Sequence, residues 1–352
     1  MFSRAVPRLS LLQKTLAQQS APRYFSSSIA MQEIKTVTVF GAGLMGAGIV
    51  QVAAHNGVKV IMTDVSDAAL ENGLAIITKS LTRIAKKLHP DSSSDQASLL
   101  SSTFANITTT TSAQEAVSNT DLVIEAIVEN LAVKQELFKK LDGMAKKETI
   151  FASNTSSLSV KSIGELCSAE RQERFAGFHA FNPVPQMKLV EIVQTDKTSD
   201  ETRDSLLELC KVMKKTSVNC KDTPGFIVNR LLVPYMLEAI RMVERGDASA
   251  ADVDTAMKLG AGLPMGPLEL SDVRLSFSTF HPLTLTELTK NARQFVGLDT
   301  LSAIARGWRD ERVATGEIDA KAVEQVESLE RLVAEGKKGR KSGMGFFDYA
   351  KK

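Results

Sequence analysis

The stretch Glu33–Asp64 reads EIKTVTVFGAGLMGAGIVQVAAHNGVKVIMTD and carries the clearest fold signal of this chain. A β-branched run leads into GAGLMG at residues 41–46, and an apolar helical pattern follows. A second run, Val58–Met62, then ends just before Asp64. A strand, a GxGxxG turn, a helix and a second strand closed by an acid together predict a dinucleotide-binding βαβ unit.

Each part of this unit has a physical task. Gly41 permits the tight turn, Gly43 lets the backbone approach a pyrophosphate, and Gly46 allows the helix to pack closely on the strand. The helix N-terminus offers free N–H groups to the phosphates. Asp64 can accept hydrogen bonds from a ribose 2′-hydroxyl and would repel a 2′-phosphate, so the stretch predicts NAD rather than NADP. A glycine turn without a ligand is the alternative interpretation.

Further along the chain, strand and helix patterns continue to alternate. We expect helices at Asp67–Leu88 and Leu131–Lys140, strands at Asp121–Glu129 and Thr149–Ser153, and a loop in the Ser-rich stretch Pro90–Ser102. This alternation predicts an α/β Rossmann-type fold with a doubly wound parallel sheet. Ligands of such a sheet bind at the carboxyl ends of its strands.

Beyond the sequence KDTPG at residues 221–225, which we expect to be a hinge, the pattern changes. Only helical periodicity follows, which predicts an all-α C-terminal domain. The expected division is an NAD-binding domain at 31–221 and a helical domain at 222–352. The expected helices are Ile227–Glu244, Ala250–Leu259, Leu301–Gly307 and Ala322–Ala334.

A candidate catalytic histidine lies in the stretch Phe175–Val193, FAGFHAFNPVPQMKLVEIV. A turn at its two prolines would fold the second apolar run back on the first and bring Glu191 to His179. A carboxylate on one imidazole nitrogen fixes the tautomer and makes the other nitrogen a better base. Such a base takes the proton from a substrate hydroxyl while the hydride leaves to a nicotinamide. From residue types alone, a buried, hydrogen-bonded structural histidine is the commoner case.

Several blocks of the sequence, in this order, resemble the mitochondrial short-chain L-3-hydroxyacyl-CoA dehydrogenase family. The resemblance runs from about Ile34 to the C-terminus with one break, and the histidine block and DTPGFIVNR are its most specific parts. The blocks are GAGLMG, LVIEAIVENLAVKQELF, FASNTSSL, FAGFHAFNPVPQMKLVEIV, DTPGFIVNRLL and GAGLPMGPLEL.

The resemblance implies a role for individual residues. His179 matches the catalytic base and Glu191 its carboxylate partner, Asn229 matches the residue that positions the substrate carbonyl, and Ser156 lies between cofactor and substrate. Ser80 and Lys87, seven residues apart on one helix face, match contacts to coenzyme A, together with Ser156. The implied NAD contacts are Gly41, Gly43, Gly46, Asp64, Glu129, Lys134, Ser156, Asn182 and Lys341.

The resemblance also implies the reaction, which is oxidation of (S)-3-hydroxyacyl-CoA to 3-oxoacyl-CoA with NAD⁺ in fatty-acid β-oxidation. It further implies a homodimer that assembles through the helical domain. Two alternatives stay open at this point. One is a 3-hydroxybutyryl-CoA dehydrogenase of narrower range, and the other is a non-catalytic NAD-binding protein of the same fold.

The first thirty residues differ from the rest of the chain. They are rich in Ser, contain no acid, and hold leucines at near-helical spacing, which is typical of a mitochondrial transit peptide. Residues 1–30 are therefore predicted to be a removable leader to the mitochondrial matrix, with a disordered basic tail as the alternative. Their basic residues are Arg4, Arg8, Lys14 and Arg23.

Composition excludes several other classes of protein. With 43 Lys+Arg and 41 Asp+Glu, the net charge of +2 is too small for nucleic acid held by bulk electrostatics. No apolar run approaches the roughly 18 residues of a membrane helix, so no membrane insertion is expected. The four histidines lie far apart in the chain, so no metal site is expected. The three cysteines form no CxxC pair and are expected to be reduced thiols.

One segment breaks the family pattern. Residues 273–294, VRLSFSTFHPLTLTELTKNARQ, separate Asp272 from Phe295, and deleting them would restore the pattern. An insertion of this length is unusual inside a compact helical domain. We hypothesise a retained intron translated in frame, and the alternative is a genuine surface insertion.

Overall fold

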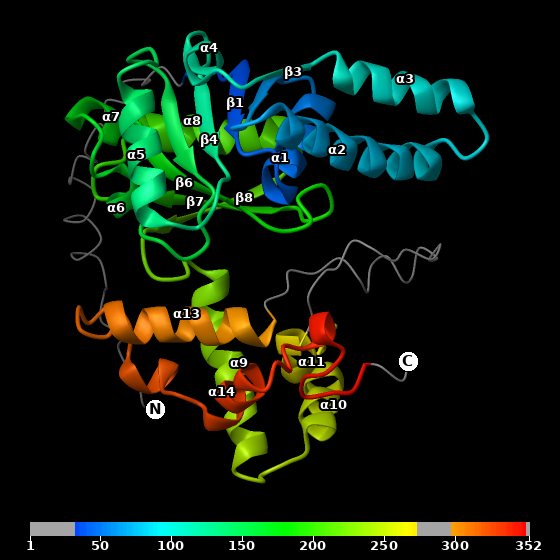
Figure 1. Ribbon diagram of the computed structural model, residues 1–352, viewed down its shortest axis with the longest axis vertical. Helices are drawn as coiled ribbons and strands as arrows, with labels where there is room; N and C mark the ends of the chain where they lie inside the picture. Colours follow the sequence, from blue (N-terminus) through cyan, green and yellow to red (C-terminus); the bar gives the residue numbers. More distant parts are fainter. Residues whose placement is uncertain (1–31, 273–296, 350–352) are drawn as a thin grey trace, which may run out of the picture.

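The computed structural model describes residues 32–272 and 297–349. The predicted leader and the atypical segment 273–294 lie outside the described residues. Figure 1 shows a sheet flanked by helices, followed by a group of helices built around α9.

An eight-stranded sheet has the order β3-β2-β1-β4-β5-β6-β7-β8. Every neighbouring pair is parallel except β6 and β7, which are antiparallel. The predicted Rossmann-type sheet is therefore confirmed, with one reversal at the histidine strand. The strands are β1 (Thr36–Phe40), β2 (Lys59–Thr63), β3 (Ile107–Thr110), β4 (Leu122–Glu125), β5 (Ile150–Ser153), β6 (Phe175–Ala180), β7 (Leu189–Gln194) and β8 (Thr216–Lys221).

Helices cover both faces of the sheet, and its central strands are therefore buried. The side chains of β4, β5 and β6 are all inaccessible to solvent, as expected for parallel strands between helix layers. The helices of this domain are α1 (Leu44–His55), α2 (Asp67–Leu88), α3 (Ser93–Phe104), α4 (Ala113–Val117), α5 (Leu131–Asp142), α6 (Val160–Gly164), α7 (Ala169–Glu173) and α8 (Asp200–Val212).

The prediction of a loop at Pro90–Ser102 is wrong, because α3 occupies most of this stretch. Ser92 caps this helix, and its Oγ accepts a hydrogen bond from the Asp95 N–H at 3.2 Å. Leu99 and Phe104 pack against the core while the serines face water. Helices α2 and α3 lie side by side and extend away from the sheet (Figure 1). The many serines suggested a loop, but the first of them is a cap.

The predicted glycine turn is held by close backbone contacts. Gly41 has a φ of +105°. A Cβ at Gly46 would lie 1.7 Å from the Gly41 carbonyl oxygen, whereas a Cβ at Gly43 would have no neighbour within 4 Å. Gly46 is therefore required by packing, and Gly43 leaves an open approach to the N-terminus of α1.

The described part of the C-terminal region is helical, as predicted. Its core is the apolar face of α9, where Val233, Met236 and Ile240 are buried. The prediction for Ala322–Ala334 is corrected, because Val326 turns into the core with extended backbone and divides the stretch in two. The helices are α9 (Val228–Glu244), α10 (Ala250–Gly260), α11 (Pro267–Asp272), α13 (Leu298–Glu311) and α14 (Glu327–Ala334), with 3₁₀ turns η1 (Ala320–Val323) and η2 (Arg340–Ser342).

Asp272 ties the last described segment to this domain. Its buried carboxylate accepts hydrogen bonds from the N–H groups of Phe346 and Phe347, both at 3.0 Å, and from the Tyr349 hydroxyl at 3.1 Å. Burial raises the pKa of Asp272 to about 6, against the opposing effect of these donors. Among the described residues, no helix is long and apolar enough to span a bilayer.

Candidate active site

The centre of the site is a hydrogen bond between two antiparallel strands. His179 on β6 and Glu191 on β7 are direct partners in the register. The Nδ1 of His179 lies 2.7 Å from the Oε2 of Glu191, and both side chains are buried. The turn and the contact predicted from the sequence are both present. An ionised carboxylate only accepts, so Nδ1 donates and Nε2 is left to act as a base.

The other oxygen of Glu191 binds the second domain. Its Oε1 accepts hydrogen bonds from the N–H groups of Ile227, at 3.1 Å, and Val228, at 2.9 Å. These groups stand at the N-terminus of α9, which has no side-chain cap of its own. The carboxylate therefore caps α9, and the positive end of the helix favours its negative charge. Sequence patterns gave no sign of this link between the domains.

Two aromatic rings enclose the histidine. The ring centroid of Phe181 lies 4.4 Å and that of Phe226 5.4 Å from the centroid of the His179 imidazole. Phe226 is buried and has a φ of +52°, an uncommon value for a residue with a side chain. This backbone conformation follows Gly225, whose φ is +75°. The two rings pack against the imidazole and cover part of it.

A cavity of about 280 Å³ opens beside His179 at the carboxyl ends of the parallel strands. Four residues singled out from the sequence meet here, although they are up to 53 positions apart in the chain. Sequence reasoning missed Asn154, whose Oδ1 accepts a hydrogen bond from the Ala180 N–H at 2.9 Å and so joins β5 to β6. The lining residues are Met45, Ala126, Ile127, Glu129, Asn154, Ser156, His179, Ala180 and Asn182.

Asp64 and the glycine turn lie at the same edge of the sheet. The Oδ2 of Asp64 accepts a hydrogen bond from the Ala42 N–H at 2.7 Å. Gly43, the N-cap of α1, has no side chain, and a Cβ at this position would have no neighbour within 4 Å. An open helix N-terminus beside a carboxylate fits the pyrophosphate and ribose of a dinucleotide.

Two of the expected cofactor contacts, Lys134 and Lys341, are held in ion pairs away from this cavity. Lys134 is almost fully buried, and its ammonium binds Glu125 at 2.7 Å and Glu129 at 2.9 Å. Lys341 pairs with Asp299 in the helical domain. Neither lysine lines the cavity beside His179.

Asn229 links the helical domain to Ser156, which lines the cavity. It lies in the first turn of α9, where it is mostly buried, and its Nδ2 donates to the Ser156 carbonyl at 3.4 Å. The cap formed by Glu191 fixes the start of α9. The same contact that orients His179 therefore also places Asn229 beside the Ser156 loop.

The comparisons with known proteins agree with this geometry. Two family models match the chain: 3-hydroxyacyl-CoA dehydrogenase, NAD binding domain, at residues 36–223, and 3-hydroxyacyl-CoA dehydrogenase, C-terminal domain, at residues 225–274. The chain belongs to the 3-hydroxyacyl-CoA dehydrogenase family. Membership confirms the predicted family, the oxidoreductase class and NAD as the cofactor.

Relatives of this dehydrogenase were found in animals and bacteria. It is 49% identical over 318 residues to the mitochondrial hydroxyacyl-coenzyme A dehydrogenase of Homo sapiens, covering 90% of this chain and 91% of that one. It is 40% identical to a probable 3-hydroxybutyryl-CoA dehydrogenase of Bacillus subtilis, covering 91% and 99%. The crystal structure of (S)-3-hydroxybutyryl-CoA dehydrogenase PaaH1 from Ralstonia eutropha is 36% identical with a TM-score of 0.77, covering 90% and 100%. The higher identity to the first enzyme favours the broader hydroxyacyl-CoA dehydrogenase function.

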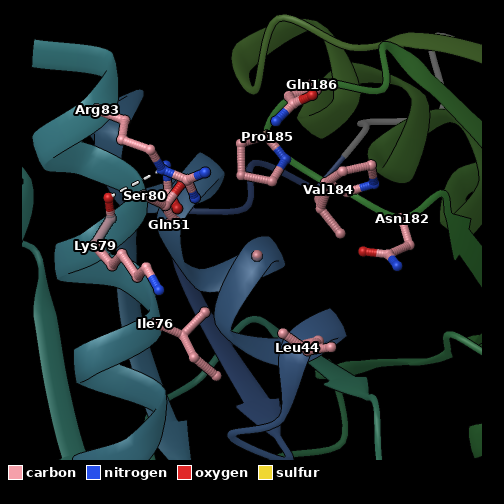
Figure 2. A pocket seen from close by; sticks show the side chains of 12 residues that line it. Leu44, Gln51, Ile76, Lys79, Ser80, Arg83, Asn182, Val184, Pro185 and Gln186 are labelled. Carbon is pink, nitrogen blue, oxygen red and sulfur yellow. Dashed lines mark hydrogen bonds between the residues drawn. The ribbon is translucent and has the colours of Figure 1, made fainter. Parts of the chain in front are cut away.

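A second cavity of the dehydrogenase, of about 140 Å³, lies between α1, α2 and the loop after β6. Figure 2 shows Ser80 in its wall with Lys79 and Arg83 from the same helix, facing Pro185 across the opening. Sequence reasoning missed the two cations. Lys87 is exposed two turns further along α2 and does not line this cavity.

The loop opposite α2 is held from behind by Lys215. Its ammonium donates to the carbonyl oxygens of Val184 and Met187, the latter at 2.7 Å. Burial lowers the pKa of Lys215 to about 8. Sequence reasoning did not identify this lysine, because its partners are carbonyl groups of a distant loop.

Proposed function

We propose that this protein oxidises (S)-3-hydroxyacyl-CoA to 3-oxoacyl-CoA with NAD⁺, as a step of fatty-acid β-oxidation. The observation that carries the proposal is the His179–Glu191 pair at the wall of a cavity that Ser156 and Asn182 also line. The family's named activity needs a base of this kind beside a dinucleotide.

Each residue around His179 has a separate role in the proposed reaction. The Nε2 of His179 takes the proton of the substrate 3-hydroxyl, and Glu191 stabilises the imidazolium that forms. NAD⁺, which the glycine turn and Asp64 would hold, would supply the acceptor for the C3 hydride. Asn229 and Ser156 hold the substrate oxygen beside His179, where donors favour the charge that develops on it. Phe181 and Phe226 keep water away from the proton transfer.

The remaining contacts belong to the two ligands. Gly41, Gly43, Gly46 and Asp64 are proposed to hold the NAD pyrophosphate and ribose, and Asn182 and Glu129 to lie beside the nicotinamide. Ser80 and Lys87 are proposed to bind the coenzyme A handle, in the role that the family resemblance gives them. We propose that Lys341 contacts the cofactor after release from Asp299. Lys134 is proposed to act on the cofactor through Glu129, to which it is paired.

A kinetic assay tests the proposed reaction. We expect NADH oxidation with acetoacetyl-CoA and with longer 3-oxoacyl-CoAs, and a loss of about 10²–10⁴-fold in His179→Ala. His55→Gln, at the far end of α1, is the matched control. Full activity in His179→Ala would reject the base, and activity with the four-carbon substrate alone would select the 3-hydroxybutyryl-CoA alternative. No turnover by the wild type would select the non-catalytic alternative.

We further propose a homodimer in the mitochondrial matrix. The location rests on the leader composition and on relatives that are named mitochondrial. The dimer rests on exposed apolar side chains of the helical domain, such as Leu231 and Leu259. The mass of the mature protein and its mass in solution by light scattering measure leader cleavage and assembly. An uncleaved, monomeric protein would contradict both.

For residues 273–294 we keep the retained-intron hypothesis. The C-terminal family model matches only as far as residue 274, the second residue of this segment. Sequencing of the mature transcript decides between the two origins, because a transcript that contains the segment establishes a genuine insertion.

A further inference from the structure

A buried chain of charges lies beneath the cavity, and the mechanism above does not use its deepest member, Glu125. This residue ends β4 and is inaccessible to solvent. Its Oε1 accepts from the Ile127 N–H at 2.8 Å and the Lys134 ammonium at 2.7 Å, and its Oε2 from the Ser153 hydroxyl at 2.6 Å. Ser153 itself accepts from the Thr155 N–H, so its proton points to Glu125. All three partners are donors, as an ionised carboxylate requires.

Lys134 connects this carboxylate to the cavity. Its ammonium also binds the Oε2 of Glu129 at 2.9 Å. The other oxygen of Glu129 accepts from the Thr155 hydroxyl at 2.6 Å and the Ser156 N–H at 3.1 Å. Burial opposes ionisation of Glu129, but Lys134 and these hydrogen bonds hold its pKa below the usual range. The cluster thus has two carboxylates and one ammonium, with a formal charge of −1.

Only one member of the cluster reaches the cavity, and that member is Glu129. Lys134 cannot contact a ligand there, because its side chain is only 1% exposed. If Glu125 were neutral, Lys134 would cancel the charge of Glu129. The cluster behind this wall therefore carries a net negative charge only while Glu125 is charged as well as Glu129.

We propose that Glu125 sets the charge of this cavity and thereby raises its affinity for oxidised nicotinamide relative to reduced nicotinamide. The nicotinamide ring is cationic in NAD⁺ and neutral in NADH, so a negative wall attracts only the oxidised form. Glu125 is thus a positioning and specificity residue that acts through Lys134 and Glu129. The inference rests on the proposed function, since it takes the nicotinamide to bind beside His179.

Cofactor binding to the full chain tests the inference without turnover. NADH is titrated by its fluorescence, and NAD⁺ by displacement of NADH. Glu125→Gln keeps the size of the side chain and an acceptor for Lys134, but loses the charge. A unit charge about 10 Å away, at an effective dielectric constant of about 20, changes affinity by roughly tenfold. We expect the Kd of NAD⁺, relative to that of NADH, to rise by this factor.

Two further variants separate charge from structure. Glu136→Gln removes the same charge from the exposed face of the same helix, α5, and should leave the ratio unchanged. The double variant Glu125→Gln/Lys134→Gln returns the cluster to −1, carried by Glu129 alone, and should restore the wild-type ratio. A purely structural pair would weaken both cofactor forms alike and would not be rescued.

The outcomes are distinct. A ratio within twofold of wild type in a folded Glu125→Gln would overturn the inference. If that variant does not fold, Glu129→Gln removes the same charge at the cavity wall. A ratio of the NAD⁺ and NADH dissociation constants within twofold of wild type in this variant would then overturn the inference. A wild-type protein that binds neither NAD⁺ nor NADH would instead reject the proposed function.

Discussion

Replacing Glu191 by Gln reverses one hydrogen bond at the centre of the site. In the structure one carboxylate oxygen faces His179 at 2.7 Å and the other faces the N–H groups of Ile227 and Val228. A Gln can place its oxygen toward the α9 amides, but its NH₂ then faces Nδ1 of the imidazole. His179 must accept there, so its proton moves to Nε2, which can no longer act as a base.

The expected size of the effect differs between activity and stability. A base held in the wrong tautomer lowers kcat by roughly 10³–10⁴-fold. The fold loses one charge-assisted hydrogen bond and the favourable charge at a helix N-terminus, together about 2–4 kcal/mol of unfolding free energy. Activity should therefore fall far more than stability.

Steady-state reduction of acetoacetyl-CoA and thermal unfolding measure the two effects. Glu165→Gln removes an exposed carboxylate of the same domain and serves as the control. If kcat of Glu191→Gln stays within tenfold of wild type while its unfolding temperature falls, Glu191 only caps α9, and the reasoning about the tautomer is refuted.

Three further predictions concern other parts of the molecule. Gly46→Ala should destabilise the fold by about 3 kcal/mol or more, because its Cβ would meet the Gly41 carbonyl. Gly43→Ala should fold normally but lose affinity for NADH. Thermal unfolding measures the stability of the two variants, and NADH titration measures their affinity. Folding should favour protonated Asp272, whose pKa is raised to about 6, so stability falls as pH rises from about 4 to 6, by about 3 kcal/mol. The difference in Tm between wild type and Asp272→Asn across this pH range measures the contribution of Asp272. A difference that stays constant with pH would contradict the prediction. Lys79→Ala should raise KM for acetoacetyl-CoA several-fold with little change in kcat, while Lys86→Ala, exposed on the same helix, should not.

Local patterns predicted most of the sheet and its ligand edge. The βαβ unit, the alternation of strands with helices, and the antiparallel return that brings Glu191 to His179 follow from periodicity, glycines and prolines. The two edge strands, β3 and β8, were not predicted. These features depend on neighbours in the chain, and such neighbours are what periodicity reports. The prediction of a loop in the Ser-rich stretch was wrong because a serine can cap a helix as well as lie in a loop. Whether a helix forms here depends on the packing of Leu99 and Phe104 against the core.

The fold class, the glycine turn with its acid, and the pairing of His179 with Glu191 could all be predicted from local patterns in the chain. The way these parts are joined became visible only in three dimensions. The cap of α9 by Glu191, the rings around His179, and the burial of Lys134 between Glu125 and Glu129 all join residues from separate elements. Hydrogen bonds form only between groups that approach within a few ångströms, and charges act on groups that are near in space. No periodicity along the chain records which distant groups come that close.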